Sequence, residues 1–265
     1  MRRSIDSNWL IIVLASVVVI AGALFTAQSA SANTIYDAAA DFDAAYTAGN
    51  NPDGPWTYGW SSTLTSALTV YPHHSNYPSS FPITFEFWDD PNNWFSNTPF
   101  VAKNIGAEFS NSLIDIPAGA LILHGGGIDH NDYTHVLWTA PVTATYSIAA
   151  DFIGRQLAGL EGPGMKADVY VLYHGSILAQ ANILGYGQSS SYSSTLHFTA
   201  GDTIDFAVGM MNESVPHAGA TELEATFTRL PEPGDWVLLA AGSLPIMVAT
   251  YFRRRRAALM ATSSE

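Results

Sequence analysis

Two apolar segments beside arginine residues, one near each end of the chain, constrain its organisation most strongly. Residues 9–25 and residues 236–252 each form a run of seventeen residues without a charged side chain. Two arginines stand before the first run, and four consecutive arginines follow the second. Runs of this kind suit a bilayer, whereas arginine is costly in its hydrocarbon core. The pattern predicts that both ends serve export and that the folded part lies between them.

The N-terminal segment has the three parts of a secretory signal peptide. Arg2 and Arg3 form a basic region, residues 9–25 form the apolar region, and Ala30-Ser31-Ala32 supplies small residues in the A-x-A pattern. We therefore predict a signal peptide over residues 1–32, cleaved after Ala32. The alternative is an uncleaved membrane anchor, because seventeen residues is close to the lower limit for a span.

The C-terminal segment predicts a single transmembrane helix. At about 1.5 Å per residue it would extend about 26 Å, close to the roughly 30 Å of a hydrocarbon core. Pro245 would kink this helix, which membrane helices tolerate. The cluster that follows should stop transfer and stay in the cytoplasm together with a tail over residues 257–265. It consists of Arg253, Arg254, Arg255 and Arg256. A buried core helix is the alternative interpretation.

A Pro-Glu-Pro motif precedes this helix. Pro231, Glu232 and Pro233 hold the backbone extended, and Trp236 stands three residues further on. The order of motif, aromatic residue, apolar span and arginine cluster over residues 230–256 resembles the PEP-CTERM sorting signal of exported proteins of Gram-negative bacteria. The order Leu-Pro-x-x-Gly also resembles the sortase signal of Gram-positive cell walls, but proline stands where that family needs threonine.

The PEP-CTERM resemblance implies partners and a destination. The protein would meet the secretion machinery, cross the inner membrane and be processed by exosortase, a membrane cysteine protease or transpeptidase. It would then reach the cell surface or the exopolysaccharide matrix of a biofilm.

Residues 33–229 remain as one acidic extracytoplasmic domain. They carry four basic and nineteen acidic residues, a net charge of −15, whereas the full chain carries −13. Such a surface repels anionic partners, so a nucleic-acid ligand is not expected. The chain contains no cysteine, which excludes disulfides, cysteine-bound zinc, iron–sulfur clusters and thiol catalysis.

Alternation of apolar and polar residues predicts that this domain is all-β. One short helix is expected near residues 36–42, and turns rich in Gly, Pro and Asn separate the other segments. Strands are predicted at 67–71, 83–88, 114–116, 120–124, 135–139, 145–152, 167–173, 194–198, 203–208 and 221–227. We therefore predict an antiparallel β-sandwich. Residues 120–227 resemble the jelly-roll β-sandwiches of carbohydrate-binding-like and galactose-binding-like modules.

Two groups of aromatic residues are candidates for sugar contact. Trp56, Tyr58 and Trp60 alternate and therefore share one strand face, whereas Trp88 and Trp94 flank a polar turn. Such rings stack on sugars when exposed, but they more often pack in a core. Packing is the preferred interpretation for both groups, with Trp60, Trp88 and Trp94 as candidate glycan contacts.

The segment over residues 124–135 is rich in potential metal ligands. Its histidines have no recognisable zinc spacing, whereas its oxygen-bearing side chains suit calcium better. A solvated loop is preferred over a metal site. The histidines are His124, His130 and His135, and the candidate ligands of a structural calcium are Asp129, Asn131 and Asp132.

No catalytic residue is predicted. The glycines at 125–127 lack the Lys-Ser/Thr of a phosphate loop, and Asp89-Asp90 is typical of a turn. Glu222 and Glu224 should share the solvent face of one strand, and a Ser–His–Asp triad cannot be identified from residue order. We predict a non-enzymatic protein with a structural or adhesive role. A carbohydrate-binding module of the exopolysaccharide matrix is the alternative, and a secreted hydrolase is third.

Changing both Pro231 and Glu232 to alanine should prevent C-terminal processing, because the extended acidic motif is lost. We expect the variant to stay in the membrane at a higher mass than the processed wild type, and intact mass spectrometry of surface-extracted protein checks this. The Glu265→Ala variant, altered in the predicted tail, is the control and should be processed normally. Surface delivery of the double variant at the mature mass would contradict the sorting interpretation.

Overall fold

The structure is a computed structural model, and it describes the central part of the chain. The described residues are 34–42, 50–52, 54–78, 84–90, 99–126, 132–157, 166–211 and 219–231. They belong almost entirely to one compact unit, Ile35–Leu230. The predicted signal peptide, the C-terminal apolar segment and most of the sorting motif lie outside them. Within these ranges no helix is long and apolar enough to cross a membrane.

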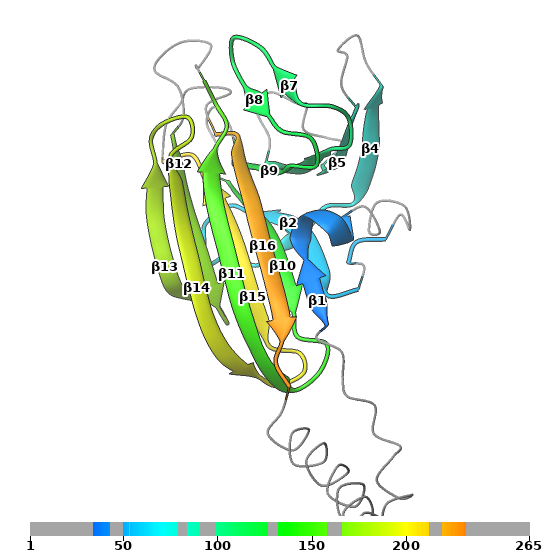
Figure 1. Ribbon diagram of the computed structural model, residues 1–265, viewed down its shortest axis with the longest axis vertical. Coiled ribbons are helices and arrows are strands. Elements are labelled where there is room, and N and C mark those ends of the chain that lie inside the picture. The colour runs from blue at the N-terminus through cyan, green and yellow to red at the C-terminus, as the bar shows by residue number, and fades with distance from the viewer. Residues whose placement is uncertain are drawn as a thin grey trace, which may run out of the picture. The chain divides into compact units, whose positions relative to one another are not determined.

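Two antiparallel sheets pack face to face in this unit (Figure 1). Sheet A has eight strands, and seven of them follow the order β14-β11-β16-β9-β6-β5-β4. They are β14 (Ser189–Phe198), β11 (Ala144–Gly154), β16 (Thr221–Arg229), β9 (Leu121–His124), β6 (Phe100–Asn104), β5 (Thr84–Asp89) and β4 (His73–Pro78). The eighth, β1 (Ile35–Asp37), pairs with the second half of β16.

Sheet B has six strands in the order β13-β12-β15-β10-β2-β3. They are β13 (Ser176–Ile183), β12 (Ala167–Tyr173), β15 (Thr203–Gly209), β10 (Tyr133–Thr139), β2 (Trp56–Ser61) and β3 (Thr69–Val70). A small ribbon of β7 (Phe109–Ser110) and β8 (Asp115–Ile116) is separate. The described chain is therefore an antiparallel all-β fold, as its alternating sequence predicts.

Alternation along the strands places one face of each sheet in a common core. On β11, every second residue from Ala144 to Gly154 is buried, while the residues between them are partly or fully exposed. The two sheets meet where Trp138 of β10 stacks on Phe227 of β16, with ring centroids 3.9 Å apart and planes inclined by 10°. Burial of one such side chain contributes roughly 1.5–3 kcal/mol. Aromatic packing therefore holds the sheets together without a disulfide.

Residues 38–42 form a short helical turn directly after β1. The Asp37 carboxylate caps this turn, because its Oδ1 accepts hydrogen bonds from the backbone N–H groups of Ala39 and Ala40 at 3.0 and 2.9 Å. Phe42 is buried in the core against the edge of Tyr58. The predicted helix is thus confirmed over residues 38–42, whereas the residues before it belong to β1.

The β7–β8 ribbon covers part of the outer face of sheet A. Ile116 of this ribbon packs with Ile122 of β9 in a second, smaller apolar cluster. The prediction that Glu222 faces solvent is therefore wrong, since its side chain is buried, whereas Glu224 is exposed. The guanidinium of Arg155 donates to the Glu222 carboxylate, with 2.5 Å between Nε and Oε2. Burial nevertheless raises the pKa of Glu222.

Raising the pH above about 10 should reduce the stability of the fold. Burial raises the pKa of the Tyr71 hydroxyl well above its usual 10.0. In the unfolded chain the Tyr71 phenol ionises near its usual pKa, whereas in the folded chain it stays protonated to a higher pH. The buried phenol therefore contributes its full stability below about pH 10, and this contribution is lost progressively as the pH rises above that value. In Tyr71→Phe we expect a smaller loss of unfolding free energy between about pH 9 and pH 11, measured by urea titration. An equal loss in both proteins would contradict this origin of the alkaline sensitivity.

Candidate functional site

The two described histidines of the predicted metal segment have separate partners. His124 stacks on Phe100 of β6 at 5.0 Å, and its Nδ1 lies 2.7 Å from the carbonyl oxygen of Gly125. His135 belongs to another network on sheet B, and Asp132 is buried. His130, Asp129 and Asn131 lie outside the described residues. No set of three His, Cys, Asp or Glu side chains suited to a metal occurs in the described ranges, and the calcium site stays a prediction.

The aromatic residues singled out from the sequence mostly pack in the core. Trp56 and Tyr58 are fully buried, and Trp60 packs against the same cluster while partly buried. Trp88 is only 1% exposed and lies parallel to Tyr58, with ring centroids 6.4 Å apart. Because Trp88 occupies an inward position of β5, the preferred interpretation of core packing is confirmed for it, and its burial contradicts the alternative of a glycan contact. Trp94 lies outside the described residues.

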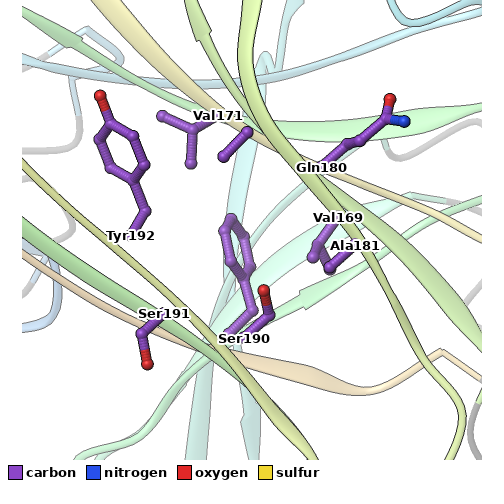
Figure 2. Close-up of a pocket in the computed structure, with 9 residues that line it drawn as sticks. Val169, Val171, Gln180, Ala181, Ser190, Ser191 and Tyr192 are labelled. Carbon is purple, nitrogen blue, oxygen red and sulfur yellow. The ribbon is translucent and has the colours of Figure 1, made fainter.

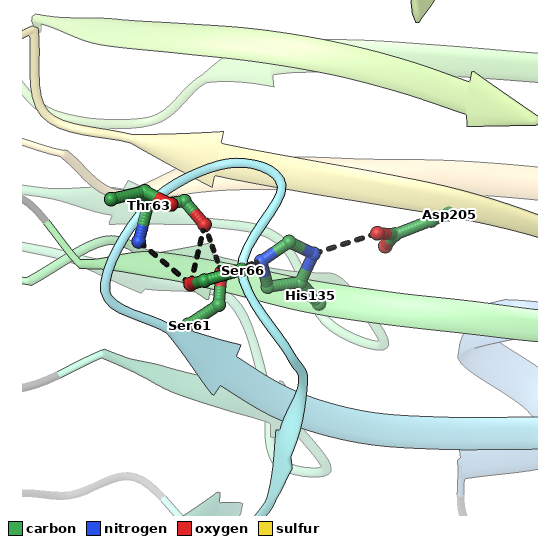
Figure 3. A network of polar contacts seen from close by, with 5 residues as sticks. All are labelled: Ser61, Thr63, Ser66, His135 and Asp205. Carbon is green, nitrogen blue, oxygen red and sulfur yellow. Dashed lines mark hydrogen bonds and ion pairs between the residues drawn. The ribbon is translucent and has the colours of Figure 1, made fainter. Parts of the chain in front are cut away.

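A chain of polar contacts joins Ser61, His135 and Asp205 on the outer side of sheet B (Figure 3). The Ser61 hydroxyl oxygen lies 2.6 Å from Nε2 of His135, and Nδ1 of the same ring lies 2.8 Å from Oδ2 of Asp205. This connectivity matches the Ser–His–Asp relay of acyl-transfer enzymes. Neighbouring strands bring the three residues together, since β10 pairs with both β2 and β15.

The surroundings of Ser61 do not suit a nucleophile. Ser61 is only 1% exposed, and its hydroxyl also donates a hydrogen bond to the backbone carbonyl of Thr63 at 2.8 Å. A nucleophile has to be reached by its substrate. The network instead attaches the turn after β2 to two strands of sheet B, and we interpret it as a structural link.

A second polar cluster on sheet B combines two tyrosines with one carboxylate. Oδ2 of Asp168 accepts hydrogen bonds from the hydroxyls of Tyr133 and Tyr170, at 3.0 and 3.1 Å. Oδ1 of Asp168 accepts a third from the backbone N–H of Met211 at 2.9 Å. The two rings stand edge to face, with centroids 5.9 Å apart and planes inclined by 70°. One buried carboxylate therefore fixes the orientation of both rings.

Small residues on the intervening strand β15 make room for this cluster. Gly209 lies opposite Asp168, and Ala207 lies opposite Tyr170. A Cβ atom on Gly209 would stand 2.5 Å from the Tyr133 ring and 2.6 Å from the Asp168 carboxylate. A larger residue at position 209 would displace both side chains, so glycine is needed there for steric reasons.

Electrostatics keep both phenols protonated. Burial is the largest cause that raises the pKa of Tyr133 and of Tyr170, and the neighbouring Asp168 carboxylate raises both further. Each hydroxyl therefore stays a hydrogen-bond donor at neutral pH. In this cluster the Asp168 carboxylate accepts three hydrogen bonds, and the two neutral tyrosine rings are partly exposed.

Exposed amides lie beside the rings. Gln180 of β13 pairs with Tyr170, Asn182 pairs with Asp168, and both amide side chains are exposed. The outer face of sheet B thus combines half-buried tyrosine rings with exposed amide groups. We call Tyr133, Asp168, Tyr170, Gln180 and Asn182 the tyrosine face. The alternation of Asp168 and Tyr170 with buried valines is the sequence signal that could have identified it.

A pocket between β13 and β14 is a weaker candidate. It holds about 190 Å³ of empty space, part of it open to solvent. Figure 2 shows Tyr192 beside it and the Gln180 amide directed away from the other side chains. The lining residues are Phe152, Val169, Val171, Ala179, Gln180, Ala181, Ser190, Ser191 and Tyr192.

Comparison with known proteins gives no family. No family model and no curated protein matches the sequence. Solved structures similar to this chain include a family 35 carbohydrate-binding module from Clostridium thermocellum, with 11% identity over 50% of this chain and 95% of that one, and a TM-score of 0.27. A CBM51 module from Clostridium perfringens in complex with methyl-galactose shows 8% identity over 51% and 94% of the two chains, with a TM-score of 0.31. Values this low establish neither a ligand nor a family for this chain.

Replacing His135 by alanine should lower the free energy of unfolding by about 1–3 kcal/mol, because the partly buried Asp205 carboxylate loses its partner and the link to Ser61 is broken. His197→Ala on the exposed face of β14 is the matched control and should change stability by less than about 0.5 kcal/mol. Urea titration of both variants by circular dichroism makes the comparison. Equal losses would show that the network does not stabilise the fold.

Proposed function

We propose that the central unit is a non-enzymatic carbohydrate-binding module and that the tyrosine face contacts the sugar. The observation that supports this most is the shared hydrogen bonding of Tyr133 and Tyr170 to Asp168. Rings held in one orientation lose little conformational freedom when a ligand binds, which favours affinity. Gln180 and Asn182 add donors and acceptors suited to sugar hydroxyls.

The charge of the domain limits the class of sugar. Residues 33–229 carry a net charge of −15, and such a surface repels polysaccharides rich in carboxylate or sulfate. We therefore propose a neutral polysaccharide, or one that contains amino sugars, as the ligand.

The proposed site of action follows from the predicted sorting signal. We propose that the signal peptide and exosortase processing deliver the domain to the cell surface or the extracellular matrix. An adhesive or structural role there would be exerted through polysaccharide binding.

Tyr170→Ala should weaken sugar binding about tenfold or more, because one fixed ring is lost from the face. Tyr170→Phe keeps the ring but loses its hydrogen bond to Asp168, and we expect an intermediate effect. A glycan array with the isolated unit identifies the ligand, and isothermal titration calorimetry then measures the dissociation constant of each variant.

The matched control is Tyr186→Ala, which removes an exposed tyrosine from the turn between β13 and β14. It should bind as the wild type does, while circular dichroism confirms that every variant is folded. Absence of any retained glycan, or wild-type affinity in Tyr170→Ala, would contradict the proposal.

A further inference from the structure

Strand β14 forms a long free edge of sheet A. It pairs with β11 along its whole length, from Ser189 to Phe198, in an unbroken register. Among the described residues no other strand pairs with it, and no turn or loop supplies its backbone with a hydrogen-bond partner. In an antiparallel sheet, alternate residues of an edge strand direct their N–H and C=O groups away from the sheet. β14 therefore presents a row of backbone groups ready for another strand.

This edge has none of the features that usually prevent strand pairing. Edge strands are commonly protected by lysine, proline, inward-facing charges or bulges. The sequence of β14, SSSYSSTLHF, contains no lysine, proline or acidic residue, and its ladder has no bulge. By contrast, the pairing of the neighbouring edge strand β13 is interrupted by an irregularity between Val171 and Leu172.

Small exposed side chains make the outer face of β14 flat. Every second residue from position 189 points to this face and is exposed. Four of these five residues are small hydroxyl residues, so a second strand meets no bulky side chain there until the end. They are Ser189, Ser191, Ser193, Thr195 and His197.

Charge selects the partner that this edge can accept. The domain is strongly acidic, so a second copy is repelled wherever acidic surfaces meet. Residues 173–201, which span both edge strands, contain no Asp, Glu, Lys or Arg. Exposed apolar side chains also gather in β13 and the turn that follows it, namely Ile177, Leu178, Leu184 and Tyr186. A neutral, partly apolar edge on an acidic body suits another copy of itself.

We propose that β14 pairs antiparallel with β14 of a second copy of this chain. A two-fold axis through Ser193 places the outer-face residues of one β14 opposite the outer-face residues of the other. Ser193 then faces Ser193 of the second copy. Such pairing is self-complementary and joins the two copies of sheet A into one continuous sheet. The pairing uses β14 of sheet A, whereas the two tyrosines of the tyrosine face lie on β10 and β12 of sheet B. Gln180 of that face lines the pocket beside β14.

The unit Ile35–Leu230 contains both apolar clusters and is the protein to test. Sedimentation velocity should show a dimer for the wild type. Ser193→Glu places like charges on both strands at the axis and should give a monomer. The matched control, Ser147→Glu, adds the same charge to the outer face of β11 and should remain dimeric. A monomeric wild type at all concentrations, or a dimeric Ser193→Glu, would overturn the proposal.

Cysteine cross-linking tests the register directly, because the chain has no cysteine of its own. Ser193→Cys should form a disulfide-linked dimer under mild oxidation, detected by non-reducing electrophoresis. Ser147→Cys, on the same face but in the interior of the sheet, should not. Failure of Ser193→Cys to cross-link, or equal cross-linking of both variants, would overturn pairing through the centre of β14.

Discussion

The stack of Trp138 on Phe227 is the contact on which the rest of the fold depends. It joins the middle of sheet B to the middle of sheet A, and the rings of Tyr146 and Phe198 meet Trp138 edge to face. Without cysteine, the two sheets are held together by apolar packing of this kind. Because the core uses the inward residues of every central strand, the polar clusters described above lie on the outer faces.

The outer faces of the two sheets differ because a glycine opens space on sheet B and a two-stranded ribbon covers part of sheet A. On sheet B, Gly209 leaves space in which the side chains of Tyr133 and Asp168 meet above β15. On sheet A, the β7–β8 ribbon covers one end and buries Glu222 against Arg155. The remainder of sheet A ends in the uncharged edge strand β14. The proposed sugar ligand is assigned to the face of sheet B, and the proposed second strand to the edge of sheet A.

Much of the strand pattern could be predicted, whereas several edge and interior strands could not. The predicted strands at 145–152, 167–173, 203–208 and 221–227 lie within β11, β12, β15 and β16. The strand prediction missed β13 and the first half of β14, because edge strands bury less of one face and so alternate weakly. It also missed the interior strands β2 and β6, whose residues are mostly buried on both faces and therefore do not alternate. The aromatic stripe of β2 was correctly interpreted as packing, but the tyrosine face was not anticipated.

The sequence by itself determined the acidic charge, the absence of disulfides, the alternating strands and the apolar ends. Only the tertiary structure decided which side chains meet. Ser61 and His135 are 74 residues apart, and His135 and Asp205 are 70 apart. Tyr133 and Asp168 are likewise brought together across β15. Periodicity reveals which face a residue occupies, but the order and register of strands from distant parts of the chain select its neighbours.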